Sequence, residues 1–516
     1  MSKITLTIII CLLFQSYTHS QNFTVSNGGS LSISKDSYLF VGGDFTNASG
    51  IVTLNSDSDE FSSLLVNGIT SGTITYNRYV NIVGSGEWDL IGAPVSGMAF
   101  STLIQDANIA NNGSGVYAVG AYDNTTDTWV NATNATAGNL MLGQGYQMAT
   151  TSGATLAFTG TIANGDQTVS IVNNDAANSG AGRRWNLIAN PFASYVFANS
   201  PSETTNNFLT VNAAAIDDAF EAIYGWNADG TGYTIYNNTS AATYIAPGQG
   251  FFVAAAGTGE NQTINFTKAM QTVVGTDDFI ASKNATTSYE LVLDMYQNKQ
   301  KLGNTKFYFK EGLTLGLDPG FDAGAFNQTK GISSRLLEQD KGIGMGINAM
   351  SVDYMSSVTV PLVIHQEAGV SLKIEIANST IPQDINVYIE DTLEKTFTLL
   401  TNNSFELIPT TKLSGSGRFY IHFTRSTLSA DTVSSTSFLT AYKGVGNAYI
   451  SIEGLQQFSQ PANFSLYNLL GMKIQSKNIP NPSQKETLST IGIKAGVYIL
   501  QINYNKSVYT KKIFID

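Results

Sequence analysis

The hydrophobic residues of this chain alternate with polar ones in short runs from about residue 21 to the C-terminus. Between residues 21 and 80 the runs are brief, and turns rich in Gly, Asn and Asp separate them at steps of roughly ten residues. Alternation with a period of two predicts β-strands with one buried face. The even spacing predicts a short β-solenoid or a meander over residues 21–80.

Two motifs occur twice, in the same order, between residues 81 and 275. The sequence GEWDLIGAPV at 86–95 matches RRWNLIANPF at 183–192, and LGQGYQMA at 142–149 matches PGQGFFVA at 247–254. Each copy places a hairpin-like segment between its two motifs. The Trp-containing motif predicts a strand that ends at Pro, and Gly-Gln-Gly predicts a tight turn. We interpret 81–275 as a duplicated β-unit, with copies at about 81–180 and 181–275.

Longer alternating runs predict a β-sandwich over residues 276–427, and an insertion rich in Gly and Asp, 313–354, is expected to cap one end. A Ser/Thr-rich segment, 428–440, predicts a linker before a last alternating region at 441–516. The fold class predicted is all-β, with several Ig-like or jelly-roll-like sandwiches in tandem. A kelch-type propeller fits less well, because the repeat is about twice the length of a blade.

The N-terminus has the pattern of a secretory signal peptide over residues 1–20. Lys3 precedes an apolar stretch that is too short to span a bilayer. The single cysteine, Cys11, lies in this segment, so the mature chain is expected to have no disulfides and no thiolate chemistry. No later apolar run reaches about 18 residues, and we therefore predict no membrane span.

The charge is divided unevenly along the chain. The whole chain carries a net charge of −12, whereas residues 441–516 contain eight lysines and three acidic residues, a net charge of +5. Residues 21–440 contain 36 acidic residues and 18 Lys plus Arg, a net charge of −18. Such an acidic region disfavours nucleic acid as a partner and favours solubility outside the cell.

Residues suited to catalysis or metal binding are scarce. The mature chain has two histidines, His365 and His422, and each lies on an alternating strand, where packing is the simpler role. Zinc and organic cofactors are therefore not expected. Two acidic clusters, 57–60 and 318–322, leave a structural calcium ion open, although neither has the spacing of an EF-hand. Scattered carboxylates leave a polysaccharide hydrolase open.

Aromatic residues near the two predicted hairpin turns are the remaining candidates for a site. Exposed aromatic rings can stack on the apolar faces of sugars. The candidates for glycan contact are Trp129, Trp226, Tyr233 and Tyr236. Two further tryptophans, Trp88 and Trp185, lie in the repeated strand motif and are expected in the core.

The C-terminal region carries a more specific pattern. Its elements are Leu466-Tyr467-Asn468 with Gly471, then Gly496 with Tyr498, then Lys511-Lys512 before the final apolar strand. Residues 441–516 thereby resemble the type A C-terminal sorting domain of the type IX secretion system (T9SS) of Bacteroidetes-type bacteria. The remainder, the passenger, resembles uncharacterised β-rich surface proteins of the same group.

The resemblance implies an Ig-like sandwich and export in two steps. The signal peptide would take the chain to the periplasm, and the sorting domain would direct the folded protein through the secretion machinery across the outer membrane. In such proteins the sorting domain is usually cleaved, and the passenger is anchored on surface polysaccharide or released. Combined with the scarcity of catalytic residues, this favours a non-enzymatic adhesion or glycan-binding protein. A polysaccharide hydrolase and a purely structural surface component are the alternatives.

Overall fold

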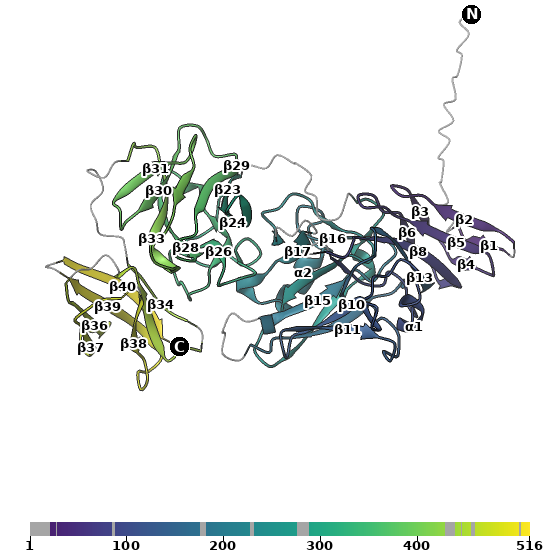
Figure 1. Cartoon of the computed structure of the whole chain (residues 1–516), viewed down its shortest axis with the longest axis horizontal. Helices are drawn as coiled ribbons and strands as arrows, with labels where there is room; N and C mark the ends of the chain where they lie inside the picture. The colour runs from purple at the N-terminus through teal and green to yellow at the C-terminus, as the bar shows by residue number, and fades with distance from the viewer. Residues whose placement is uncertain are drawn as a thin grey trace, which may run out of the picture.

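The structure is a computed structural model that describes residues 21–26, 28–84, 88–175, 182–227, 232–275, 288–428, 439–444, 446–455, 460–483, 485–504 and 507–515. The predicted signal peptide, with Cys11, lies outside the described residues, as do residues 429–438 of the predicted linker. Strands account for 52% of the structure and helices for 6%, which confirms the all-β prediction. Figure 1 shows the N-terminal and C-terminal β-bodies at opposite ends of the molecule.

The helices are all short. None of those described is long and apolar enough to cross a membrane. The α-helices are α1 (Phe100–Leu103) and α2 (Phe208–Asn212), and the 3₁₀ turns are η1 (Gly182–Arg184), η2 (Ala213–Ala215), η3 (Asp218–Phe220), η4 (Lys268–Met270) and η5 (Val352–Tyr354).

Three stacked turns of parallel strands form the N-terminal body. Its strands are β1 (Phe23–Val25), β2 (Ser30–Ile33), β3 (Tyr38–Val41), β4 (Phe45–Asn47), β5 (Ile51–Asn55), β6 (Ser63–Val66), β7 (Thr70–Ser71) and β8 (Thr73–Val80). They pair in parallel as β1-β4-β7, β2-β5-β8 and β3-β6. This pairing is that of a solenoid, and it aligns Ile33, Leu54 and Tyr76 in one buried column.

The two copies of the duplicated unit build sheets with the same strand order. The first copy contains β9 (Asp89–Ile91), β10 (Val116–Asp123), β11 (Thr128–Thr133), β12 (Tyr146–Met148), β13 (Ala154–Thr161) and β14 (Gln167–Val172). The second contains β15 (Trp185–Ala189), β16 (Tyr195–Phe197), β17 (Ile223–Asn227), β18 (Gly232–Tyr236), β19 (Tyr244–Ile245), β20 (Gly250–Ala254), β21 (Asn261–Phe266) and β22 (Gln271–Thr272). The order β11-β10-β12-β9 in one copy corresponds to β18-β17-β20-β15 in the other.

In each copy, the strand that carries the Trp-containing motif (β9 or β15) leads into a hydrogen bond with the Gly-Gln-Gly segment of the other copy. The amide of Gly92 donates to the carbonyl of Gly248 at 2.8 Å, and the amide of Ala189 donates to the carbonyl of Gly143 at 2.8 Å. Gly143 and Gly248 have φ values of 78° and 67°, so the first glycine of each motif makes the expected turn. The two copies are therefore held together by an approximately symmetric exchange of backbone hydrogen bonds.

The second glycine of each motif has a different role, which is to make room for the other copy. A Cβ atom on Gly250 would lie 2.7 Å from the carbonyl carbon of Leu90, and one on Gly145 would lie 2.9 Å from the carbonyl oxygen of Ile188. Because these neighbours are backbone atoms, they cannot rotate away.

We expect Gly250→Ala to destabilise the duplicated unit by about 1–3 kcal/mol, because the added methyl group would push two strands apart. The measurement is chemical unfolding followed by tryptophan fluorescence. Gly165→Ala is the matched control, since a Cβ there meets nothing within 4 Å. Equal effects of the two substitutions would contradict this role for Gly250.

A continuous eleven-stranded sheet follows. Its strands are β23 (Tyr289–Gln297), β24 (Gln300–Phe309), β25 (Ala323–Gly324), β26 (Gly331–Ser334), β27 (Met345–Met350), β28 (Ser357–Gln366), β29 (Leu372–Ser379), β30 (Asn386–Asp391), β31 (Thr396–Leu399), β32 (Phe405–Leu407) and β33 (Leu413–Thr424). Buried residues from distant strands, such as Leu293 of β23 and Ile421 of β33, share one core, so the sheet curls over a single interior.

The insertion at 313–354 does not cap this body as expected. Its strands β26 and β27 lie in the middle of the sheet, where β27 is buried along its whole length. Its residue Phe326 stacks on Trp185 of the second copy, with ring centroids 4.4 Å apart. The insertion therefore joins the sheet to the duplicated unit, and its Gly and Asp content hid these short strands.

The C-terminal body has two sheets around one core. Its strands are β34 (Thr440–Lys443), β35 (Tyr449–Glu453), β36 (Ala462–Asn468), β37 (Lys473–Ile479), β38 (Lys485–Ser489), β39 (Gly496–Tyr504) and β40 (Ser507–Ile515). They form the sheets β34-β35-β38 and β37-β36-β39-β40. Ile450 and Ile452 from the first sheet pack with Leu466 and Leu500 from the second.

Candidate functional site

The two aromatic hairpins predicted from the sequence converge on one buried ring, Phe252 of β20. Tyr122 and Trp129 form a cross-strand pair in the hairpin β10–β11, and their ring centroids lie 5.1 and 6.2 Å from that of Phe252. Trp226 and Tyr233 form the corresponding pair in β17–β18, and Tyr233 lies 5.7 Å from Phe252. The duplication thus builds an aromatic core between its two copies.

The four candidate aromatic residues differ in what they can reach. Trp129 is 37% exposed at the surface, whereas Tyr233 stacks on Phe326 at 3.8 Å and is committed to packing. Tyr236 is only 8% exposed. Trp226 is half-buried and lies with Tyr236 in the wall of a cleft, so the structure separates the candidates into one surface residue, one packing residue and two cleft residues.

The cleft lies between the solenoid and the duplicated unit, of which both copies contribute to its lining, and its volume is about 350 Å³. That volume is within the range of small-ligand sites. Its lining residues come from the β5–β6 loop, β8, β9, β17, β18 and β20, and from the loops that follow β8 and precede β20. They are Ser58, Asp59, Arg78, Tyr79, Asn81, Asp89, Leu90, Ile91, Trp226, Asn227, Tyr236, Gln249 and Gly250.

A buried arginine holds the base of the cleft together. The side chain of Arg78 is only 2% exposed, and its Nε donates to the carbonyl of Pro247 at 3.1 Å. Its guanidinium also lies 4.1 Å from the centre of the Phe61 ring. Because Arg78 belongs to the solenoid and Pro247 to the second copy, the two walls of the cleft are fixed relative to each other.

The polar lining of the cleft includes Tyr79 and two carboxylates, those of Asp59 and Asp89. The backbone amide of Asn81 donates to Asp89 Oδ2 at 2.7 Å, which fixes this carboxylate. Burial, together with the negative charges of Asp89 and Asp59, raises the pKa of the Tyr79 hydroxyl. Trp226, two carboxylate residues and several amide residues in the lining of one cleft match the hydroxyl groups and apolar faces of a sugar.

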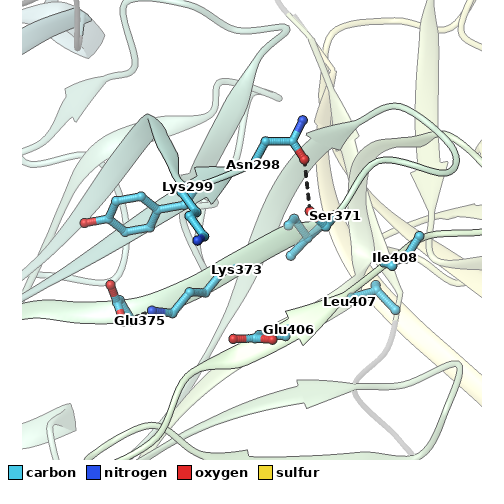
Figure 2. A pocket seen from close by; sticks show the side chains of 10 residues that line it. Asn298, Lys299, Ser371, Lys373, Glu375, Glu406, Leu407 and Ile408 are labelled. Atoms are coloured by element: carbon cyan, nitrogen blue, oxygen red, sulfur yellow. Dashed lines mark hydrogen bonds and ion pairs between the residues drawn. The ribbon is translucent and has the colours of Figure 1, made fainter.

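A second, shallower groove of about 930 Å³ lies on the eleven-stranded sheet (Figure 2). It is lined by Tyr296, Asn298, Lys299, Ser371, Leu372, Lys373, Glu375, Glu406, Leu407 and Ile408. Figure 2 shows the amine of Lys373 directed toward Glu375, and these two groups lie 2.7 Å apart. Exposed ion pairs of this kind contribute little and exchange readily with water. We therefore favour the cleft over the groove as the candidate site.

His422 and the two acidic clusters have structural partners, whereas Nε2 of His365 is buried without a hydrogen-bond partner among the described residues. His422 contacts Thr359 through Nδ1 at 2.9 Å and Glu390 through Nε2 at 2.8 Å. The carboxylates of Asp57 and Glu60 pair with the amine of Lys35. Both oxygens of Asp322 accept backbone amides in the insertion. Over the described ranges, no group of three or more His, Cys, Asp or Glu side chains could hold a metal ion.

The signature residues of the C-terminal body lie mainly at its turns and strand ends. Gly471 has a φ of 80° in the β36–β37 turn, and Tyr498 donates its hydroxyl to the carbonyl of Lys494 at 2.8 Å. The centre of the Tyr467 ring lies 5.6 Å from the amine of Lys473. The other signature positions are Gly496 at the start of β39, and Lys511 and Lys512 in β40.

The two-sheet C-terminal body with this signature is that of an exported protein. Residues 446–516 match the family described as the Secretion system C-terminal sorting domain, which confirms the resemblance. The protein is a cargo of the type IX secretion system, exported across the outer membrane to the cell surface or the extracellular space, and its sorting domain implies contact with the secretion machinery. Over residues 6–423 the chain belongs to the family described as Domain of unknown function (DUF8693). No curated protein matches the chain.

Proposed function

We propose that the exported passenger is a non-enzymatic adhesion or glycan-binding protein, and that the cleft beside Trp226 is its binding site. The observation that carries the proposal is the combination of Trp226 with carboxylate and amide residues in the lining of one fixed cleft. Sugar binding needs ring stacking together with many hydrogen-bonding groups, and it needs no metal or cofactor.

The fixed geometry of the cleft also supports binding. Arg78 holds its two walls together, so less conformational freedom is lost when a ligand enters. Export delivers the passenger to the place where polysaccharides are accessible. A purely structural surface component would have no use for such a cleft.

A polysaccharide hydrolase is the second candidate, because Asp59 and Asp89 lie in the same cleft. Glycoside hydrolysis needs one carboxyl group to donate a proton and another to act as nucleophile or base. The Asp89 carboxylate already accepts the amide of Asn81, and Asp59 is exposed on a loop. Neither arrangement favours a proton donor.

The test is a binding screen of residues 21–428 on immobilised polysaccharides of plant, algal and bacterial origin, with reducing sugars measured in the supernatant. We expect retention on at least one polysaccharide without release of sugar. Release that is abolished by Asp89→Asn would establish the hydrolase instead. A passenger that is retained on no polysaccharide would overturn the proposed function.

A further inference from the structure

The sorting domain contacts the eleven-stranded sheet through buried charged groups. Arg335 of the passenger pairs with Asp340 through Nε and Oδ2 at 3.0 Å, and these side chains are only 4% and 3% exposed. The ring of Tyr442, from β34 of the sorting domain, covers this pair, and the guanidinium lies 4.1 Å from its centre. A passenger ion pair is therefore kept from water by a sorting-domain side chain.

A sorting-domain carboxylate, Glu453, is bound by the passenger in turn. Its Oε2 accepts the backbone amide of Ser416 at 3.0 Å and the hydroxyl of the same residue at 2.6 Å. Its Oε1 accepts the hydroxyl of Tyr442 at 2.6 Å and lies 3.2 Å from the amine of Lys485. Burial alone would raise the pKa of Glu453, but Arg335 and these partners lower it to about 2, so the group is charged at neutral pH.

The backbones of the two bodies meet where only glycine fits. A Cβ atom on Gly417 of β33 would lie 2.3 Å from the Cα of Gly454. A Cβ atom on Gly342 would lie 2.3 Å from the ring of Tyr442. Lys511 of β40 adds a further contact, because its amine donates to the carbonyl of Leu337 at 3.2 Å. A domain that is merely tethered needs neither close backbone approach nor buried charge.

We propose that the sorting domain docks on its own passenger through a specific intramolecular interface, so that the two form one rigid unit. The passenger face around Arg335, Ser416 and Gly417 is the surface, and the strands β34 and β35 of the same chain are its partner. The net charges of +5 on residues 441–516 and −18 on residues 21–440 favour the same association. Docking covers the Arg335–Asp340 pair, and removal of the sorting domain would expose it.

The test uses the full mature chain with a protease site placed in segment 429–438. After complete cleavage, the passenger and the sorting domain are passed together over a size-exclusion column at low micromolar concentration. We expect the two fragments to co-elute, because the interface does not depend on the covalent connection. Separate elution of the two folded wild-type fragments would overturn the proposal.

Variants locate the interface. Tyr442→Ala removes the ring over Arg335 and Glu453→Gln removes the charge held by Ser416, and each is expected to weaken association of the fragments at least about tenfold. Lys473→Ala is the control, since its side chain is exposed and contacts Tyr467 within its own domain. If Tyr442→Ala prevents folding, Glu453→Gln remains a valid test, and association as tight as that of the control would contradict the proposed contacts.

Discussion

Replacing Phe252 with alanine is expected to lower the free energy of unfolding of the duplicated unit by about 3–5 kcal/mol. Phe252 is 1% exposed and contacts aromatic rings from both hairpins and from the insertion. Its removal leaves a cavity that these strand-bound rings cannot fill by small movements. Its position between the two copies makes it the centre of their shared core.

The chain offers a selective probe for this measurement. All four tryptophans lie between residues 88 and 226, so tryptophan fluorescence reports on the duplicated unit. Chemical unfolding of residues 21–428 should show an earlier fluorescence transition in the variant. Phe397→Ala is the control, because Phe397 lies on the edge strand β31 of the other sheet. An unchanged midpoint in Phe252→Ala would show that the aromatic core does not hold the copies together.

Replacing Arg335 with methionine is expected to lower the free energy of unfolding of the eleven-stranded body by about 3–5 kcal/mol. The substitution leaves Asp340 buried without its cation, and the penalty arises mainly from this uncompensated charge. Hydrogen exchange of the β26–β28 region in the full mature chain measures the loss.

A double variant separates the cost of an unpaired charge from the value of the pair. Arg335→Met combined with Asp340→Leu should recover most of the lost stability, because the unpaired charge of Asp340 is then gone and Glu453 keeps Ser416 and Lys485 as partners. A double variant as unstable as the single one would contradict this reason for the effect. In the double variant, the ring of Tyr442 would pack on the apolar side chain of the introduced methionine in place of the Arg335 guanidinium.

The sequence was sufficient for the fold class and the sorting domain, because both depend on local pattern. Alternation with period two predicts strands wherever one face is buried, and the sorting signature is a set of turns and strand ends close together in the chain. The repeat was also visible, since its Trp and Gly-Gln-Gly motifs survive in both copies.

What the sequence did not predict depends on contacts between distant segments. The backbone hydrogen bonds between the copies, and the close approach of Gly250 to the backbone of Leu90, depend on how the two sheets face each other. The cleft likewise combines residues from two bodies. One signal was present: Arg78 occupies the inward phase of β8 with Ile74, Tyr76 and Val80. A charged residue at a buried strand position indicates a specific partner, here the carbonyl of Pro247.

The roles of the candidate aromatic residues also could not be predicted from the sequence alone. Trp226 and Tyr233 are cross-strand neighbours in one hairpin, and the sequence gives no means of telling which of them faces the cleft. The ring of Phe326 decides this, because Tyr233 stacks on it while Trp226 lines the cleft.

The most direct test of the proposed site compares two tryptophan variants of residues 21–428 on a polysaccharide that retains the passenger. Trp226→Ala removes a ring from the cleft, whereas Trp129→Ala removes a more exposed ring that does not line it. In affinity electrophoresis, Trp226→Ala is expected to weaken binding by about 1–2 kcal/mol, roughly a five- to thirtyfold loss, and Trp129→Ala to leave it unchanged. Undiminished binding by Trp226→Ala would contradict the assignment of the cleft as the glycan site.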